Sequence, residues 1–313
     1  MRLLAMSGFI PEQICDLVRF TGYAGDRNLA HYCGYASDYI SQVLRDDTID
    51  GAVFPRSCDS SRIMSAYLKE SGKFMHQIRI PSGKGIAALD YFASEIHAFK
   101  IEVEKYFKAG AEDITERIER INARNRELRD VYENIGYISF ADYLKSVHEM
   151  LRRPLSEQKV PVSYVPRKPT RRRIFLSGSF LANVGIVEEI EKNGMTIVGD
   201  TLTESGRMLS APDINPQGDL FRNIAAGIMG SRMSPTQNDF QSILNRDMEE
   251  IKRKDVKGVI FITQKYCESY DYLFTVYKKT LDAAGIPVLQ ITLSDSAEEG
   301  KSGLCIGAFS DIL

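Results

Sequence analysis

The second half of the chain alternates short apolar strands with helix-length segments, and this alternation limits the fold more than any other feature. Apolar runs that predict strands lie at Ile174–Leu176, Met195–Val198, Val259–Thr263 and Val288–Leu293. Runs that predict helices lie at Val184–Lys192, Asp219–Ile228, Asp239–Lys252, Tyr272–Ala284 and Leu304–Ile312. Strands joined through helices form βαβ units, whose strands run parallel. This half therefore predicts an α/β fold with a mainly parallel sheet.

The first half carries the same signals more sparsely. Strands are predicted at Ala52–Phe54 and Gln77–Ile80, and a helix is predicted at Ile10–Arg19, whose apolar residues share one face. From Ile86 to Leu151 the pattern is almost wholly helical and heavily charged. We expect a helical insert over about residues 86–151.

A basic, proline-rich stretch over residues 152–173 separates the two halves. It carries four prolines between basic residues, a composition typical of linkers. We therefore expect an N-terminal α/β lobe with its helical insert over residues 1–160 and a C-terminal α/β lobe over residues 161–313.

The composition excludes several classes of protein. The 313 residues carry a formal net charge of −2, whereas nucleic-acid binders usually show a strong basic patch. No apolar run reaches the ~18 residues of a membrane span, and the acidic Glu12 and Asp16 follow the short apolar start too closely for a signal peptide. Five cysteines in a chain of this length do not predict a disulfide scaffold. We expect a cytoplasmic protein that binds neither nucleic acid nor membranes.

Two stretches of the chain resemble each other and carry a cysteine at the same place. DGAVFPRSCDSSRIMSAYL (residues 50–68) and KGVIFITQKYCESYDYL (residues 257–273) each pass from a glycine through a buried strand into a polar loop. The loops deliver Cys58-Asp59-Ser60 and Cys267-Glu268-Ser269, and we expect both acids to cap the helices that follow. Ligands of open α/β sheets bind beyond the carboxyl ends of the strands. The repeat therefore favours functional cysteines over partly buried loop thiols.

Cys33 stands in a third glycine-bearing loop before a helix, in HYCGYASDY. Three loop cysteines from distant segments predict a site for a soft metal, although their spacing does not identify which metal. His31 offers a fourth ligand for a zinc site as an alternative. Cys15 and Cys305 have apolar neighbours and are predicted to be core residues.

The remaining polar motifs give weaker signals. His97 and His148 fall in charged helices and are predicted to be surface residues. PSGKG at residues 81–85 lacks the full spacing of a phosphate loop. SGSFLANVG at residues 177–185 follows a strand and opens a helix, so its backbone amides are candidates for holding a phosphate, against an ordinary strand-to-helix turn.

Several of these segments together resemble the 2-hydroxyacyl-CoA dehydratase family, which includes benzoyl-CoA reductase subunits, and the chain is most like its D-component. The matching segments are IPEQICDLVRFTG, the Cys33 loop, DGAVFPRSCDSSR, INARNRELRDVY, RIFLSGSFLANVGIVEEIEKNGMTIVGDTLTESGR and, most specifically, KGVIFITQKYCESYDYLFTVYKKTLDAAGIPVLQITLS. The resemblance implies two flavodoxin-like lobes that hold one 4Fe–4S cluster between them. Its cluster ligands correspond to Cys33, Cys58 and Cys267.

The resemblance also implies a reaction and partners. Members of the family eliminate water from a 2-hydroxyacyl-CoA thioester through a radical, using one electron from a separate ATP-hydrolysing iron–sulfur activator, and they commonly pair two homologous subunits. No catalytic side chain is carried over, because SGLCIGAF occupies the region where the family has a Gln after the last strand. The alternatives are a benzoyl-CoA-reductase-like or accessory electron-transfer subunit without substrate chemistry of its own, and a zinc-stabilised binding protein.

Overall fold

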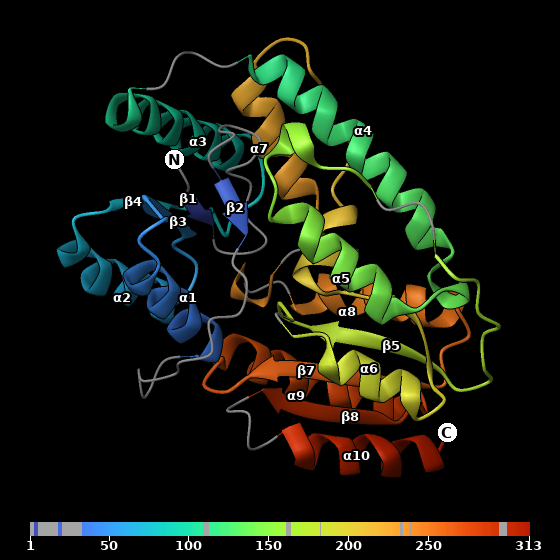
Figure 1. Cartoon of the computed structure of the whole chain (residues 1–313). Helices are drawn as coiled ribbons and strands as arrows, with labels where there is room; N and C mark the ends of the chain where they lie inside the picture. Colours follow the sequence, from blue (N-terminus) through green and yellow to red (C-terminus); the bar gives the residue numbers. More distant parts are fainter. Residues whose placement is uncertain are drawn as a thin grey trace.

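The computed structural model describes residues 3–5, 18–20, 33–108, 113–160, 164–181, 183–231, 234–237, 240–293 and 299–313. Its described residues form two four-stranded parallel sheets with helices packed around them (Figure 1). The first sheet contains β1 (Leu3–Ala5), β2 (Val18–Phe20), β3 (Gly51–Pro55) and β4 (Phe74–Ile78). The second contains β5 (Arg173–Gly178), β6 (Thr196–Asp200), β7 (Gly258–Gln264) and β8 (Val288–Leu293).

Both sheets have the same strand order. It is β2-β1-β3-β4 in the first sheet and β6-β5-β7-β8 in the second, so the second strand of each set lies at an edge beside the first. Every neighbouring pair runs parallel. The predicted α/β class with parallel sheets is confirmed, and β3 and β7, the strands of the sequence repeat, occupy equivalent positions.

The helices follow the sequence pattern closely after residue 33. They are α1 (Gly34–Arg45), α2 (Asp59–Leu68), α3 (Ile86–Phe107), α4 (Ile114–Glu133), α5 (Phe140–Leu151), α6 (Gly185–Lys192), α7 (Leu220–Gly230), α8 (Phe240–Arg253), α9 (Glu268–Ala283) and α10 (Glu299–Asp311). None of the described helices is long and apolar enough to cross a membrane.

The predicted helix at Ile10–Arg19 is wrong at its carboxyl end. Val18 and Arg19 belong to strand β2, which pairs with β1, and residues 10–17 lie outside the described part of the chain. The β-branched and aromatic side chains of Val18 and Phe20 suit a strand. Pairing with a segment 15 residues away, Leu3↔Val18 in the register, is a long-range contact that helical spacing does not reveal.

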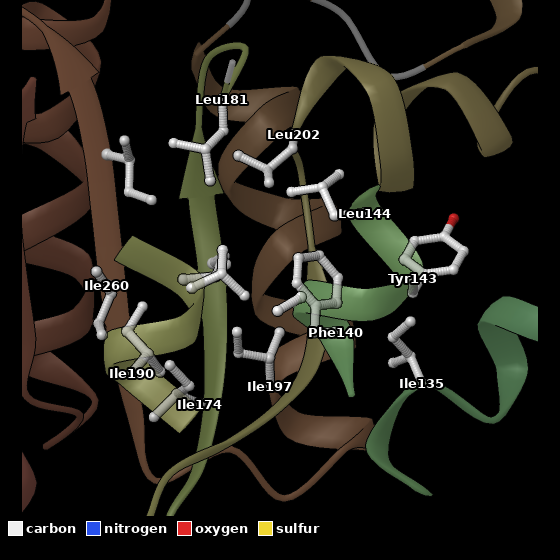
Figure 2. Packing of buried hydrophobic residues seen from close by; sticks show 14 of the residues in the cluster. Ile135, Phe140, Tyr143, Leu144, Ile174, Leu181, Ile190, Ile197, Leu202 and Ile260 are labelled. Carbon is white, nitrogen blue, oxygen red and sulfur yellow. The ribbon is translucent and has the colours of Figure 1, made fainter. Parts of the chain in front are cut away.

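Helix α5 packs on the second sheet although it precedes that sheet in the chain. Phe140, Tyr143 and Leu144 belong to the same buried cluster as Ile174 and Ile197 of the strands. Figure 2 shows Phe140 and Leu144 directed toward Ile197 and Leu202. The helical segment predicted as an insert of the first lobe thus contributes to the core around the second sheet.

Helix α7 makes the reverse exchange. Its Ile224 and Ala225 pack with Phe92 and Phe99 of α3 in the cluster that also contains Val53 of the first sheet. Within the described residues the chain passes to the surroundings of the second sheet at α5, back to those of the first at α7, and again to those of the second at α8. Each sheet is therefore completed by a helix from the other half of the sequence. The division at residue 160 stays a prediction.

Candidate functional site

All three predicted ligand cysteines lie at helix N-termini. Cys33 is the N-cap residue of α1, Cys58 that of α2 and Cys267 that of α9. In α1 the thiol takes the capping role itself, because Cys33 Sγ accepts a hydrogen bond of 3.4 Å from the amide of Ala36. The positive end of the α1 dipole thus acts directly on the Cys33 sulfur, and Cys58 and Cys267 stand at the positive ends of α2 and α9.

The expected capping by the acids is wrong in detail. Asp59 and Glu268 are the first residues of α2 and α9, while the cysteines before them hold the N-cap positions. Ser61 braces the α2 end, since its Oγ accepts from the amide of Cys58 at 3.1 Å and donates to the Cys58 carbonyl at 2.8 Å. Asp59 and Glu268 still add negative charge to the first turn, which stabilises a helix there.

The structure brings the three cysteines together from distant parts of the chain. The amide of Gly34 donates to the carbonyl of Lys265 at 3.3 Å, which joins the Cys33 loop to the Cys267 loop. Cys267 also packs against the buried cluster that contains Cys33. The charge of Cys58 raises the pKa of Cys33, and the charges of Cys33 and Cys58 raise the pKa of Cys267, so the three side chains lie near one another.

Burial keeps two of these thiols protonated unless a cation joins them. Burial first, with the neighbouring thiolate second, raises the pKa of Cys33 to about 11 and that of Cys267 to about 12. The hydroxyl of Ser60 and the amide of Ala36 oppose the shift at Cys33 by donating to its sulfur. A bound metal removes this penalty because it takes the thiolate directly.

The geometry does not match a site for one metal ion. Among the described residues, no group of three or more His, Cys, Asp or Glu side chains gathers tightly enough to hold a single ion. His31, the fourth ligand of the alternative zinc site, lies outside the described residues. Cys15 lies outside them as well.

Cys305 is exposed, so its prediction as a core residue is wrong. Helix α10 buries Ile306 and Phe309, three residues apart on one face, and this turns Cys305 to the outer face.

An open groove of about 470 Å³ gives access to Cys58. Arg56, Arg62 and Arg79 line it together with Ser57, Cys58 and Asp59. Arg62 pairs with Asp59 at 3.4 Å, and Arg79 pairs with Glu95 at 3.3 Å. Of the three cysteines, Cys58 therefore faces the most accessible and most basic surroundings.

His148 and Glu204 form a buried polar pair that the sequence did not predict, beside Phe180. The ring of Phe180 packs on Tyr35, two residues after Cys33, with centroids 5.3 Å apart, and on His148 with centroids 5.8 Å apart. His148 Nε2 lies 3.5 Å from Glu204 Oε1, with side-chain exposures of 11% and 0%. The prediction of His148 as a surface residue is wrong, because α5 packs this face onto the second sheet.

Four polar atoms in this region are buried without a hydrogen-bond partner among the described residues. They are His148 Nε2, Ser179 Oγ, Glu204 Oε2 and Arg207 Nε. Buried polar atoms are nearly always hydrogen-bonded in native proteins, so such a concentration is typical of a site that binds a ligand or water. The sequence held no local signal for it, since the polar residues Thr203 and Ser205 flank Glu204 in the run TLTESGR.

The loop SGSFLANVG is an ordinary strand-to-helix turn over its described residues. The amide of Gly178 donates to Thr201 Oγ1 at 3.2 Å, that of Ser179 to the Ile262 carbonyl at 3.3 Å, and that of Leu181 to Glu204 Oε1 at 3.0 Å. These amides are therefore already satisfied, and the phosphate-binding interpretation fails for them.

Comparison with known proteins places the chain in a family. A family model described as 2-hydroxyglutaryl-CoA dehydratase, D-component, matches residues 2–313. The chain is 23% identical over 310 residues to the (R)-phenyllactyl-CoA dehydratase beta subunit of Clostridium sporogenes, covering 91% of this chain and 81% of that one. It is 22% identical over 249 residues to a subunit of the benzoyl-CoA reductase of Thauera aromatica, covering 72% and 64% respectively.

Proposed function

Because the chain belongs to the 2-hydroxyglutaryl-CoA dehydratase D-component family, we propose that it is the iron–sulfur subunit of a 2-hydroxyacyl-CoA dehydratase-type enzyme. The reaction is the elimination of water from an acyl-CoA thioester by a radical route, with the electron supplied by an ATP-dependent iron–sulfur activator. The observation that carries the proposal is the convergence of Cys33, Cys58 and Cys267 at three helix N-termini.

A 4Fe–4S cluster suits this set of donors. Thiolates are the usual ligands of such clusters, and each thiolate binds a different iron, so the sulfurs need not surround one point as they do around a single ion. Held by Cys33, Cys58 and Cys267, such a cluster would keep one iron without a protein ligand and would supply an electron and a Lewis acid. We further propose that each sheet and its helices form a flavodoxin-like lobe, since the order β2-β1-β3-β4 recurs in β6-β5-β7-β8.

The protein's own residues would supply the proton that the reaction needs. Loss of a hydroxyl as water needs a proton, and the pair His148 and Glu204 is a buried proton carrier on the Phe180 side of the cysteines. Glu204→Gln preserves the hydrogen bond that Oε1 accepts from Leu181 but removes the ionisable group. We expect turnover to fall at least ~100-fold, whereas Glu188→Gln, a change at a half-exposed partner of Lys145, leaves it unchanged.

The cluster ligands are tested by anaerobic purification with iron and sulfide analysis. Serine at Cys33, Cys58 or Cys267 should cause loss of iron because a hard hydroxyl replaces a soft thiolate. Cys305→Ser is the matched control, since that thiol is free and exposed. Full iron content in a Cys58→Ser, Cys267→Ser double variant would contradict the ligand assignment, and a colourless zinc protein would support the binding-protein alternative.

A second function is supported by the similarity to a reductase subunit. A benzoyl-CoA-reductase-like or accessory subunit would carry the same cluster and pass electrons without binding substrate. Titration of the reduced protein with acyl-CoA separates the two. A change in the cluster's spectrum on adding the thioester supports the dehydratase subunit, and an unchanged spectrum supports the electron carrier.

A further inference from the structure

A cavity of about 230 Å³ outside the cysteine site collects cationic side chains from three separate segments. Lys84 comes from the loop before α3, Arg207 from the turn after β6 and Arg246 from α8. The hydroxyl-bearing residues Thr201, Ser231 and Ser242 complete its polar lining. Hydroxyl donors and several cations around one cavity suit a ligand with many acceptor oxygens.

The charge of this cavity is positive on balance. Its one carboxylate is Asp247, which is buried and accepts a hydrogen bond of 2.9 Å from the hydroxyl of Tyr277. Three cations thus face one anion that the protein already engages. Guanidinium groups bind phosphate through two parallel hydrogen bonds, and a lysine ammonium binds it as a point charge.

Lys84 belongs to PSGKG, the motif whose spacing was too incomplete to predict a phosphate loop. In the structure Lys84 nevertheless stands just before a helix and lines a cavity. Gly85, the N-cap of α3, has φ of +110°, a conformation that only glycine adopts readily, and it leads the chain directly from Lys84 into the helix. Lys84 therefore stands at the positive end of a 22-residue helix, on the wall of a basic cavity.

The inner side of the cavity lies close to the cysteines. Arg207 stacks over the ring of Tyr270 with its guanidinium carbon 5.9 Å from the ring centroid. Tyr270 lies in the first turn of α9, where its amide donates to the carbonyl of Cys267 at 3.1 Å. Arg207 is half-buried, whereas Lys84 and Arg246 are exposed. The cationic lining thus extends from the solvent to Arg207, and Tyr270 alone lies between Arg207 and the candidate cluster ligand Cys267 in this chain of contacts.

We propose that this cavity binds the phosphate groups of the acyl-CoA substrate, with Lys84 and Arg246 as the phosphate contacts on its exposed side. Met229 and Ile243 supply apolar surface for the neighbouring parts of the cofactor. A cavity of this volume holds a diphosphate portion and not the whole molecule, so the thioester arm extends past it. This proposal rests on the proposed function for the identity of the ligand.

Calorimetric titration of CoA into the full chain tests the proposal. We expect the Lys84→Gln, Arg246→Gln double variant to bind CoA about tenfold or more weakly than the parent, since each change removes a charge-assisted contact. Arg120→Gln is the control, because it removes a similar exposed charge from α4, outside both this cavity and the groove beside Cys58. Pantetheine, which lacks phosphates, should bind the parent and the double variant equally. Circular dichroism verifies that each variant is folded.

Two results would overturn the proposal. One is a folded double variant that binds CoA as tightly as the parent, and the other is a parent that binds inorganic phosphate or ADP at this cavity but not CoA. The binding assay needs neither cluster nor turnover, so it is independent of the reaction. If the protein eliminates water and the double variant binds CoA as tightly as the parent, the CoA site is wrong and the proposed function stands. If the double variant binds CoA more weakly but the protein holds no iron and has no activity, the proposed function is wrong and the CoA site stands.

Discussion

Replacement of Asp200 by Asn will change how the stability of this protein depends on pH while leaving its folded structure in place. The carboxylate is buried at the end of β6 and holds the turn that carries Glu204 and Arg207. Its Oδ1 accepts hydrogen bonds from the amides of Leu202 at 2.7 Å and Gly206 at 3.0 Å.

An asparagine side chain fits the same contacts. Its carbonyl oxygen replaces Oδ1 and keeps both amide donors. Its amide nitrogen replaces Oδ2, which accepts from Ser205 Oγ at 2.8 Å, and the rotatable hydroxyl of Ser205 can turn to accept instead. The variant therefore removes the charge of Asp200 with little change of shape.

The size of the change in unfolding free energy with pH follows from the pKa of the Asp200 carboxyl group. Burial, against four opposing hydrogen bonds, raises the pKa of Asp200 from 3.8 to about 6. The folded protein then binds this proton more tightly than the unfolded chain, so its contribution is present in full below the unfolded pKa and is lost as the pH rises through the folded pKa. Between about pH 4.5 and about pH 7.5 the parent should lose about 2 kcal/mol of unfolding free energy from this group, and the variant none.

Urea denaturation of both proteins over this pH range measures the effect. Subtracting the unfolding free energy of the parent from that of the variant cancels the contributions of the other titrating groups. This difference should increase as the pH rises. A difference that is constant with pH, or that changes in the opposite direction, refutes the account of a desolvated carboxylate. Asp213→Asn is the control of opposite sign, because Arg129 and Arg126 outweigh partial burial and lower the pKa of Asp213. The stabilisation from Asp213 is complete above its unfolded pKa of 3.8 and is lost as the pH falls below it. That variant should therefore fall behind the parent as the pH rises through the range below about pH 4, and should keep a constant difference from it over the range used for Asp200.

Three further changes test packing and assembly. Gly206→Ala would place a Cβ 2.1 Å from the carbonyl oxygen of Asp200 and 2.9 Å from the hydroxyl of Tyr132, and should lower the unfolding free energy by about 3 kcal/mol; unchanged urea stability would show that the turn yields. Leu144→Ala, at a fully buried residue of α5, should lower the unfolding free energy by about 2–5 kcal/mol. Ile101→Ala on the exposed face of α3 should lower it little. Equal losses in thermal unfolding would contradict the packing of α5 on the second sheet. Because both relatives are named as subunits of larger enzymes, we expect a dimer, homo- or heteromeric, in anaerobic light scattering, and a strict monomer active without ATP would contradict this.

The sequence alone determined the elements whose signals are local. β7 reads as a continuous apolar run, and all seven of its residues are buried because the strand lies inside a parallel sheet. The repeat of strand, cysteine and acid predicted equivalent places for Cys58 and Cys267, and both became N-caps of the helices after equivalent strands. Periodicity and chain order carry this information, so no long-range contact was needed to predict it.

Only the tertiary structure decided which segments meet. β1 and β2, three residues each, carry too little periodicity to be seen without their partner. The helix around His148 has apolar residues along one face, but the sequence does not show that α5 buries this face on a sheet formed later in the chain. Lys84, Arg207 and Arg246 line one cavity although more than 160 residues separate the first from the last. These residues become neighbours because the chain passes back and forth between the two sheets. The contacts that stabilise this arrangement join segments far apart in the sequence, so the local pattern of residues does not predict them.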